Sequence, residues 1–225
     1  FASKNNVMIS LATHGKMLVD TIAHNVIGEI VGTEFPNEFI TIGGHLDSWD
    51  NGEGAHDDGA GVVQSIDVLG MFKKAGLKPK HSIRAIAFMN EENGLRGGTA
   101  YGEVAKKENK KFIMAMESDA GGFTPRAIGI SATSHEQFKK MEQWASLLKP
   151  YGTEIRAGGG GADIGPLKNV NASIVLAGLV PDSQRYFDLH HAKTDVFENV
   201  NKRELHLGAV NMAAIIYLID KYGVK

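Results

Sequence analysis

Residues 38–47 read E-F-I-T-I-G-G-H-L-D, an apolar run that ends in His45 and Asp47. A run of this kind is typical of a buried strand. The next such run along the chain also ends in ionisable side chains, the adjacent Glu91 and Glu92. Two neighbouring carboxylates repel each other, and the low dielectric near a core increases the cost. We therefore expect either a positive charge beside these acids or a proton held by one of them.

The hydrophobic pattern alternates along the chain between the period of a strand and that of a helix. This alternation predicts an α/β fold, a three-layer sandwich with a mixed, mainly parallel central sheet flanked by helices. In such sheets, ligands bind outside the carboxyl ends of the strands, so the residues after each strand are the first functional candidates. The predicted strands are 7–12, 25–32, 38–44, 82–89, 112–118 and 172–178, and helices are predicted between residues 59 and 76 and over 99–108, 134–149 and 201–222.

Size and composition exclude several classes of protein. The 225 residues can bury an ordinary core, and 43% hydrophobic and 22% charged residues are usual proportions. A formal net charge of -2 predicts neither nucleic acid nor a membrane surface as a partner. No apolar run approaches the roughly 18 residues that span a bilayer. Because there is no cysteine, a metal would have to be held by His, Asp and Glu.

The segments after the predicted strands repeatedly offer imidazole and carboxylate groups. Such donors without cysteine suit zinc or a similar divalent ion. One catalytic zinc takes about three protein ligands, whereas two ions about 3.5–4 Å apart also need a carboxylate between them, so the many acids favour two ions. One of the adjacent glutamates can bind an ion, and the other can take a proton from the water that the ions acidify. The candidates are His45, Asp47, Asp57, Asp58, Glu91, Glu92, Asp119, His190, His191 and Asp195.

Five short motifs occur in order: G-G-H-L-D-S-W-D (43–50), G-A-H-D-D-G-A-G (54–61), N-E-E-N-G (90–94), M-E-S-D-A-G (116–121) and H-H-A-K-T-D (190–195). Together they resemble the co-catalytic zinc exopeptidases, a family of bacterial aminopeptidases and glutamate carboxypeptidases, and within it the plasma glutamate carboxypeptidase type. The resemblance runs from about residue 25 to the C-terminus, and five ordered motifs are much more specific than any one alone. It implies a metallo-exopeptidase that cleaves short peptides or dipeptides with two zinc ions per chain.

The resemblance assigns the metal ligands residue by residue. It implies that His45 and Asp119 are terminal ligands of one zinc ion. Glu92 and His191 would be terminal ligands of the other, and Asp57 would bridge both ions. Each of these positions holds the residue type that the family pattern requires.

The resemblance also implies roles for the acids around these ligands. Glu91 would be the general base, and Asp47 would be the acid behind the first histidine ligand. Asp195 stands where the family has an acid shortly after the last histidine ligand, which gives it a supporting role. The peptide bond after the bridging acid is cis in the family, so the Asp57–Asp58 bond is expected to be cis. Asp58 itself is expected to cap the following helix.

Asp163 and Tyr186 are the least specific candidates. A-G-G-G-G-A-D-I-G (157–165) is not a phosphate loop, because no Lys-Ser/Thr follows it. It is either a flexible connection or, as the resemblance implies, a loop near the cleft whose Asp163 positions substrate. Tyr186 either donates a hydrogen bond to the tetrahedral intermediate or packs in the core. His190 is expected to pack or to support its neighbour, and His56 lies at a position that is not a ligand in the family.

The extent of the resemblance suggests the domain organisation. Residues 1–24 are expected to be an N-terminal lead left from a preceding segment, and residues 25–225 the zinc peptidase domain. Relatives of the plasma type carry a protease-associated domain before the catalytic part, so either that domain is absent or the chain is a fragment. The start at F-A-S-K, without an initiator Met or a signal peptide, favours a processed or truncated product. The resemblance implies an extracytoplasmic location, secreted or periplasmic, and leaves a homodimer open.

Three other interpretations compete with this one. A glutaminyl-cyclase-type acyltransferase shares the fold but uses a single zinc ion. A catalytically inactive relative that acts as a binding module would have lost ligands, and none is lost here. A calcium-binding module prefers cages made only of oxygen, which the two histidines disfavour. The recognised end of the peptide also stays open between amine binding by Asp163, Asp182 or Asp188 and carboxylate binding by Arg96, Arg126, Arg156 or Arg185.

Overall fold

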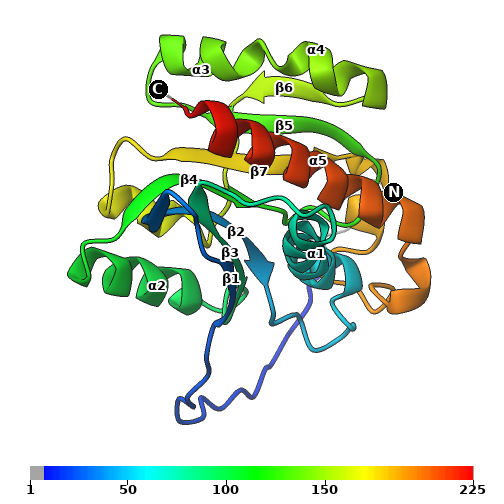
Figure 1. Cartoon of the computed structure of the whole chain (residues 1–225). Coiled ribbons are helices and arrows are strands. Elements are labelled where there is room, and N and C mark those ends of the chain that lie inside the picture. The colour runs from blue at the N-terminus through cyan, green and yellow to red at the C-terminus, as the bar shows by residue number, and fades with distance from the viewer. Residues whose placement is uncertain (1–7, 225) are drawn as a thin grey trace.

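The computed structural model describes residues 8–224, which include one seven-stranded sheet in the order β1-β3-β2-β4-β7-β5-β6 (Figure 1). The four central strands run parallel, β1 and β5 are antiparallel to their central neighbours, and β6 is parallel to β5. The predicted α/β class with a mixed, mainly parallel sheet is therefore confirmed. The strands are β1 (Val26–Ile30), β2 (Phe35–His45), β3 (His81–Phe88), β4 (Lys111–Glu117), β5 (Pro125–Ser131), β6 (Glu154–Ala157) and β7 (Val175–Pro181).

Helices cover both faces of the sheet (Figure 1). The long helices α1 and α5 pack with α3 and α4 on one face, where Val68, Met141 and Ile216 belong to one buried cluster with Ile42 of β2. On the other face, Tyr101 of α2 belongs to a second cluster. No helix among the described residues has both the length and the apolar character of a membrane span. The helices are α1 (Ala60–Lys74), α2 (Arg96–Lys107), α3 (His135–Glu142), α4 (Ala145–Leu148) and α5 (Lys202–Tyr222).

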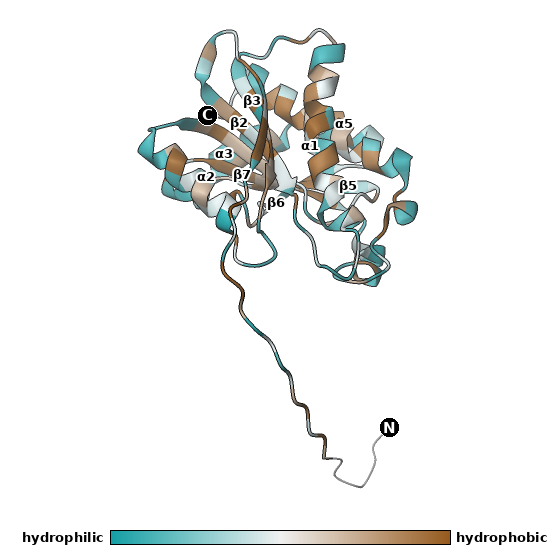
Figure 2. Cartoon of the chain, turned by 90° about the horizontal axis from the view of Figure 1, so that it is seen from below, coloured by the Kyte–Doolittle hydropathy of each residue, from teal (hydrophilic) through white to brown (hydrophobic). Residues whose placement is uncertain are grey.

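The strand expected over 7–12 is wrong for residues 8–12, which form no strand; Val7 lies outside the described residues. Side chains in this segment are open to solvent, and Met8 is 93% exposed. Figure 2 shows the segment before β1 leading away from the folded body. Apolar and β-branched composition favours a strand only where a neighbouring strand and a core receive it, and here neither does.

The sequence did not predict strands β5 and β6 or the break between α3 and α4. β5 and β6 form the end of the sheet beyond the antiparallel β5–β7 pair. β5 contains Pro125 and Gly129 and β6 has only four residues, so both carry little signal. The helix predicted over 134–149 is divided into α3 and α4. At the division the chain tightens, and the Trp144 N–H donates to the Met141 carbonyl three residues back. Both side chains stay buried, so the predicted apolar face is kept across the break.

The carboxyl ends of β2, β3, β4 and β7 lie at one edge of the sheet, because these strands are mutually parallel. The start of α1 packs closely against this edge. A Cβ atom on Gly44 would lie 2.2 Å from Asp58 Oδ2, and one on Gly61 would lie 1.8 Å from the Ser118 carbonyl oxygen. Only glycine allows this approach, so these two residues bring the acids before α1 to the ends of β2 and β4.

Candidate metal centre and active site

The five predicted metal ligands lie together at the carboxyl edge of the sheet. His45 at the end of β2 has its Nε2 atom 3.2 Å from Asp57 Oδ1 and 3.5 Å from Asp119 Oδ1. His191 Nε2 lies 3.2 Å from Asp57 Oδ2 and 3.1 Å from Glu92 Oε2. The two oxygens of Asp57 thus face two different imidazoles, and two groups of donors share this one carboxylate.

The donor chemistry fits a divalent metal. Asp57 Oδ2 and Glu92 Oε1 are buried and accept no hydrogen bond from any described residue. A buried carboxylate oxygen without a donor is costly unless a cation or a proton compensates it. Two sets of donor atoms lie within 4.8 Å of one another: His45 with Asp57 and Asp119, and Asp57 with His190 and His191. Imidazole and carboxylate donors of this kind suit zinc.

The site also requires positive charge on electrostatic grounds. Burial lowers the pKa of His45, but hydrogen bonds to Asp119 and Asp57 and the charge of Asp58 outweigh it, and the pKa is raised to about 12. The imidazole therefore holds a proton when no other cation is present. A divalent ion would take the place of that proton, and its charge would compensate the repulsion between the neighbouring carboxylates.

His190 lies closer to the metal ligands than the sequence suggested. Its Nε2 atom is 3.5 Å from Asp57 Oδ2, and its ring stacks on that of His191 with the centroids 3.6 Å apart. His191 has the positive backbone φ of 56°, which is uncommon outside glycine and occurs where surrounding structure enforces it. Of the two histidines, His191 is the one that also reaches Glu92.

Asp47 is arranged differently from its expected role. The His45 Nδ1 atom lies 2.8 Å from the backbone oxygen of Asp47, whereas the nearest Asp47 carboxylate oxygen is 4.0 Å away. The carboxylate instead accepts the backbone N–H groups of Glu91 at 3.0 Å and Glu92 at 3.3 Å. Asp47 therefore fixes the ring of His45 through its backbone and the two glutamates through its side chain.

The backbone turns at Asn90, which has a φ of 65°, directly before the two adjacent glutamates. Glu92 faces His191. The pKa of Glu91 is raised by burial and by Asp119, Glu92 and Asp47, against the lowering effect of His45. Glu91 is also only partly buried. A partly exposed carboxylate with a raised pKa is suited to accept and return a proton.

Asp195 and Asp58 hold the backbone around Asp57. The Asp195 carboxylate accepts the N–H of His56 at 2.7 Å and the N–H of Asp57 at 3.0 Å. Asp58 accepts the N–H of His45 at 3.0 Å and that of Gly61 in the first turn of α1 at 2.9 Å, and the Asp57–Asp58 peptide bond is cis. The end of β2, the start of α1 and the loop that carries Asp195 are thereby held around Asp57.

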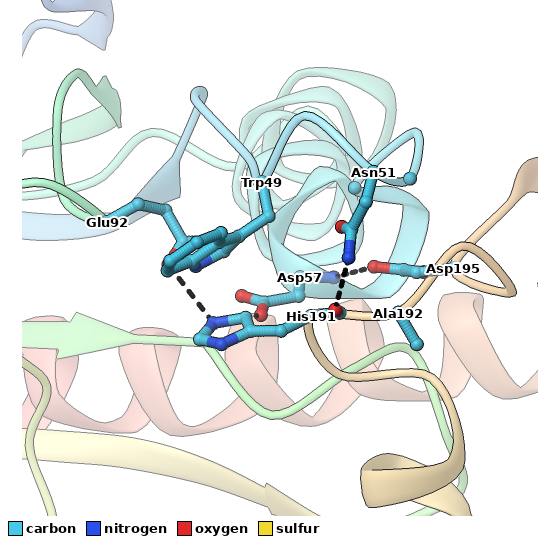
Figure 3. Close-up of a pocket in the computed structure, with 9 residues that line it drawn as sticks. Trp49, Asn51, Asp57, Glu92, His191, Ala192 and Asp195 are labelled. Carbon is cyan, nitrogen blue, oxygen red and sulfur yellow. Dashed lines mark hydrogen bonds and ion pairs between the residues drawn. The ribbon is translucent and has the colours of Figure 1, made fainter. Parts of the chain in front are cut away.

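Two residues beside the second imidazole were missed from the sequence. The indole Nε1–H of Trp49 donates to Glu92 Oε2 at 2.7 Å, and its ring centroid lies 5.0 Å from that of His191. Asn51 Nδ2 donates to the backbone oxygen of His191 at 2.8 Å (Figure 3). The motif of residues 43–50 contains the tryptophan, but its spacing alone gave no reason to bring it to the segment that carries His191.

Tyr186 and Asp163 approach the same centre. The ring of Tyr186 lies 4.9 Å from that of His190, and burial together with the charges of Asp57 and Asp119 raises its pKa, so the hydroxyl stays protonated and can donate. Asp163 is buried, with neither carboxylate oxygen hydrogen-bonded to a described residue. Burial, opposed by His45, raises the pKa of Asp163 to about 7.

Comparison with known proteins identifies the family, since residues 25–216 match the sequence model of Peptidase family M28. The chain belongs to this family. The family resemblance expected from the five motifs is therefore confirmed. Carboxypeptidase Q of Homo sapiens is 34% identical over 215 residues, and that of Bos taurus is 31% identical over 217 residues. These matches cover 95% and 96% of this M28 chain but 45% of each relative, so it spans about half their length.

Solved structures give the same picture. A Peptidase M28 precursor from Shewanella amazonensis superposes with a TM-score of 0.81 at 30% identity, over 87% of this M28 chain and 44% of that chain. A zinc aminopeptidase from Bacillus subtilis gives 0.69 at 20% identity over 86% and 49%, and an Acidobacteriales glutaminyl cyclase gives 0.64 at 14% over 88% and 74%. The last two likenesses concern the fold alone.

Proposed function

We propose that this chain is a di-zinc exopeptidase that cleaves short peptides, dipeptides included. The main support is the geometry of Asp57, whose Oδ1 lies 3.2 Å from His45 Nε2 and whose Oδ2 lies 3.2 Å from His191 Nε2. A pair of adjacent ions requires a carboxylate between two sets of terminal ligands, and this arrangement meets that requirement.

One ion would be held by His45, Asp119 and Asp57, and the other by Glu92, His191 and Asp57. When bound, the two ions would lower the pKa of a shared water and polarise the scissile carbonyl. The carboxylate oxygens without donors on Asp57 and Glu92 support this assignment.

Glu91 would act as the general base, taking a proton from the attacking water and passing it to the leaving amine. Its raised pKa and partial exposure support both halves of this role. Tyr186 would donate its phenolic hydrogen to the oxyanion, because burial and nearby acids keep that group protonated. Asp47 would keep Glu91 in place through the hydrogen bond to its backbone N–H.

The recognised end would be the free amino terminus, held by Asp163. Two observations support this role: both oxygens of this buried carboxylate lack a hydrogen-bonding partner among the described residues, and the charges of His45 and Glu91 act on its pKa. The four arginines considered for carboxylate binding each form an ion pair with an acid of the chain: Arg96 with Asp20, Arg126 with Asp182, Arg156 with Glu154 and Arg185 with Glu204.

A dipeptide panel, assayed with zinc-loaded and chelator-treated protein alongside a metal count, tests the proposal. We expect zinc-dependent cleavage, two ions per chain, tolerance of a carboxy-terminal amide and loss of cleavage on amino-terminal acetylation. Cyclisation of amino-terminal glutamine with one ion per chain would favour the glutaminyl-cyclase interpretation instead. No turnover with both ions bound would favour a binding module. Unchanged KM and kcat in Asp163→Ala would remove that residue from substrate binding.

A further inference from the structure

His56 lies next to the central carboxylate Asp57, yet it belongs to neither group of candidate metal ligands among the described residues. It is 1% exposed, and both of its ring nitrogens are already engaged. The Gly122 N–H donates to Nδ1 at 3.1 Å, and Nε2 lies 3.2 Å from the Asn199 carbonyl oxygen. A buried imidazole with both nitrogens satisfied by backbone groups is a structural connector rather than a ligand.

These two contacts join segments that carry different ligands. Gly122 follows Asp119 by three residues in the loop after β4, and Asn199 lies in the loop that runs from His191 to α5. The ring belongs to the segment that carries Asp57. One side chain thus connects the three loops that hold a ligand of one ion, a ligand of the other, and the carboxylate between them.

The backbone and the ring face of His56 strengthen the same connection. Its N–H donates to Asp195 Oδ1 at 2.7 Å, so the loop before α5 is attached twice. Its ring stacks on Phe123 with centroids 4.4 Å apart and an interplanar angle of 14°. The Arg185 guanidinium also contacts the Phe123 ring, at 4.7 Å from its centroid, and it precedes Tyr186 directly in the chain.

The two partners determine the tautomer of the ring. A backbone N–H can only donate, so Nδ1 of His56 has to accept; a carbonyl can only accept, so Nε2 has to carry the proton. Asparagine can imitate the Nδ1 acceptor and glutamine the Nε2 donor, but neither side chain reaches both partners with the rigid geometry of an imidazole. The position therefore selects histidine on hydrogen-bonding geometry.

We propose that His56 is a positioning residue that holds Asp57, Asp119 and His191 at the separations needed to bind a pair of metal ions. The inference rests on the proposed di-zinc function for its metal, but it concerns the affinity of the site and not the reaction. Hydrogen-bonding partners behind metal ligands typically change metal affinity by about 10–100-fold when they are removed. His56 acts on three ligand segments together, so we expect its loss to fall within that range.

The decisive variant is His56→Phe, which keeps an aromatic ring against Phe123 and removes both ring hydrogen bonds. His81→Phe is the matched control, because the His81 side chain is only 12% exposed, stacks on an aromatic ring and hydrogen-bonds Asp220. It begins β3, seven residues before the end of that strand near the site, which is about 23 Å at about 3.3 Å per residue.

Zinc affinity is measured by competition with a chromogenic chelator, below the unfolding temperature of each variant and without substrate. We expect His56→Phe to bind zinc about 10–100-fold more weakly, His56→Asn and His56→Gln to recover part of the loss, and His81→Phe to lose thermal stability with unchanged zinc affinity. With cobalt as the probe, His56→Phe should also show a shifted absorption spectrum.

Zinc affinity within twofold of wild type in His56→Phe, or an equal loss in His81→Phe, would overturn the positioning role. If His56→Phe does not fold, His56→Asn and His56→Gln decide the matter by the same criterion. Failure of the proposed function looks different, because zinc-loaded wild-type protein would then cleave no peptide whatever the variants bind.

Discussion

Replacing Asp195 by Asn removes one of the two backbone hydrogen bonds that keep Asp57 in place. The Asp195 carboxylate is 3% exposed and accepts the N–H groups of His56 and Asp57. The amide oxygen of Asn can keep one of these bonds, but its NH₂ group would face the other N–H. Asp195→Asn changes almost no volume, so its effect reports on the hydrogen bonds and the charge of this carboxylate rather than on packing.

The expected loss of stability follows from those two bonds. A hydrogen bond to a charged acceptor contributes about 1.5–3 kcal/mol, and a buried N–H left without an acceptor costs about 1–3 kcal/mol, terms that overlap. We therefore expect Asp195→Asn to lower the free energy of unfolding of the zinc-free protein by about 2–4 kcal/mol. This is a large share of the roughly 5–15 kcal/mol typical of a domain.

Asp220→Asn is the matched control for this experiment. Asp220 is 6% exposed and likewise accepts two consecutive backbone N–H groups, those of Lys80 at 3.0 Å and His81 at 2.8 Å. Asp220 lies near the end of α5, away from the metal ligands, and also bonds the His81 ring. The Asp220→Asn protein should therefore lose at least as much stability as the Asp195→Asn protein.

The two variants are expected to differ in the stability that they gain from zinc. Urea unfolding is measured with chelator and again with excess zinc, which stabilises the folded state according to its affinity. If Asp195→Asn weakens zinc binding about 10-fold, it gains about 1.4 kcal/mol less from zinc than wild type does for each ion affected. Asp220→Asn should gain as much as wild type. Equal gains in all three proteins would refute the reasoning that Asp195 maintains the metal-binding geometry of Asp57.

Four further outcomes are expected. Glu91→Ala should retain zinc and lose most of kcat, whereas Asp57→Ala should also lose metal; full activity in Glu91→Ala with normal zinc content would refute the general base. Trp49→Phe, which keeps the ring and removes the bond to Glu92, should weaken binding of one ion by about 10-fold in chelator competition. Lowering the pH should reduce kcat/KM by protonating Glu91, and this limb should start at a higher pH than for an ordinary glutamate because the pKa is raised. In zinc-free protein, burial and then Asp163 and Asp119 raise the pKa of Glu117 from 4.5 to about 8. Between these pH values the folded state binds a proton that the unfolded state has lost, so the free energy of unfolding should fall as the pH rises. Glu117→Gln should make this pH dependence less steep, and an unchanged slope would contradict the role of Glu117.

Local sequence carried enough information for the core of the fold. β2 and β4 are near-continuous apolar runs because helices cover both faces of a parallel sheet, and such runs are recognisable without a structure. β5 and β6 were not recognisable, because short strands at the end of a sheet owe their existence to neighbours that are distant in sequence. The exposed segment after residue 7 made the opposite error, with strand-like composition and no partner.

The sequence by itself determined which donor groups are available. Its cysteine-free, ordered motifs of His, Asp and Glu at strand ends limited the site to imidazole and carboxylate chemistry, because residue type fixes ligand chemistry. Tertiary structure decided which atoms meet. It directed the Asp47 carboxylate to the glutamate backbone, brought Trp49 to Glu92, and made His56 a connector of three loops. Such contacts span up to 143 residues of chain, and only the packing of the sheet edge sets distances of that kind.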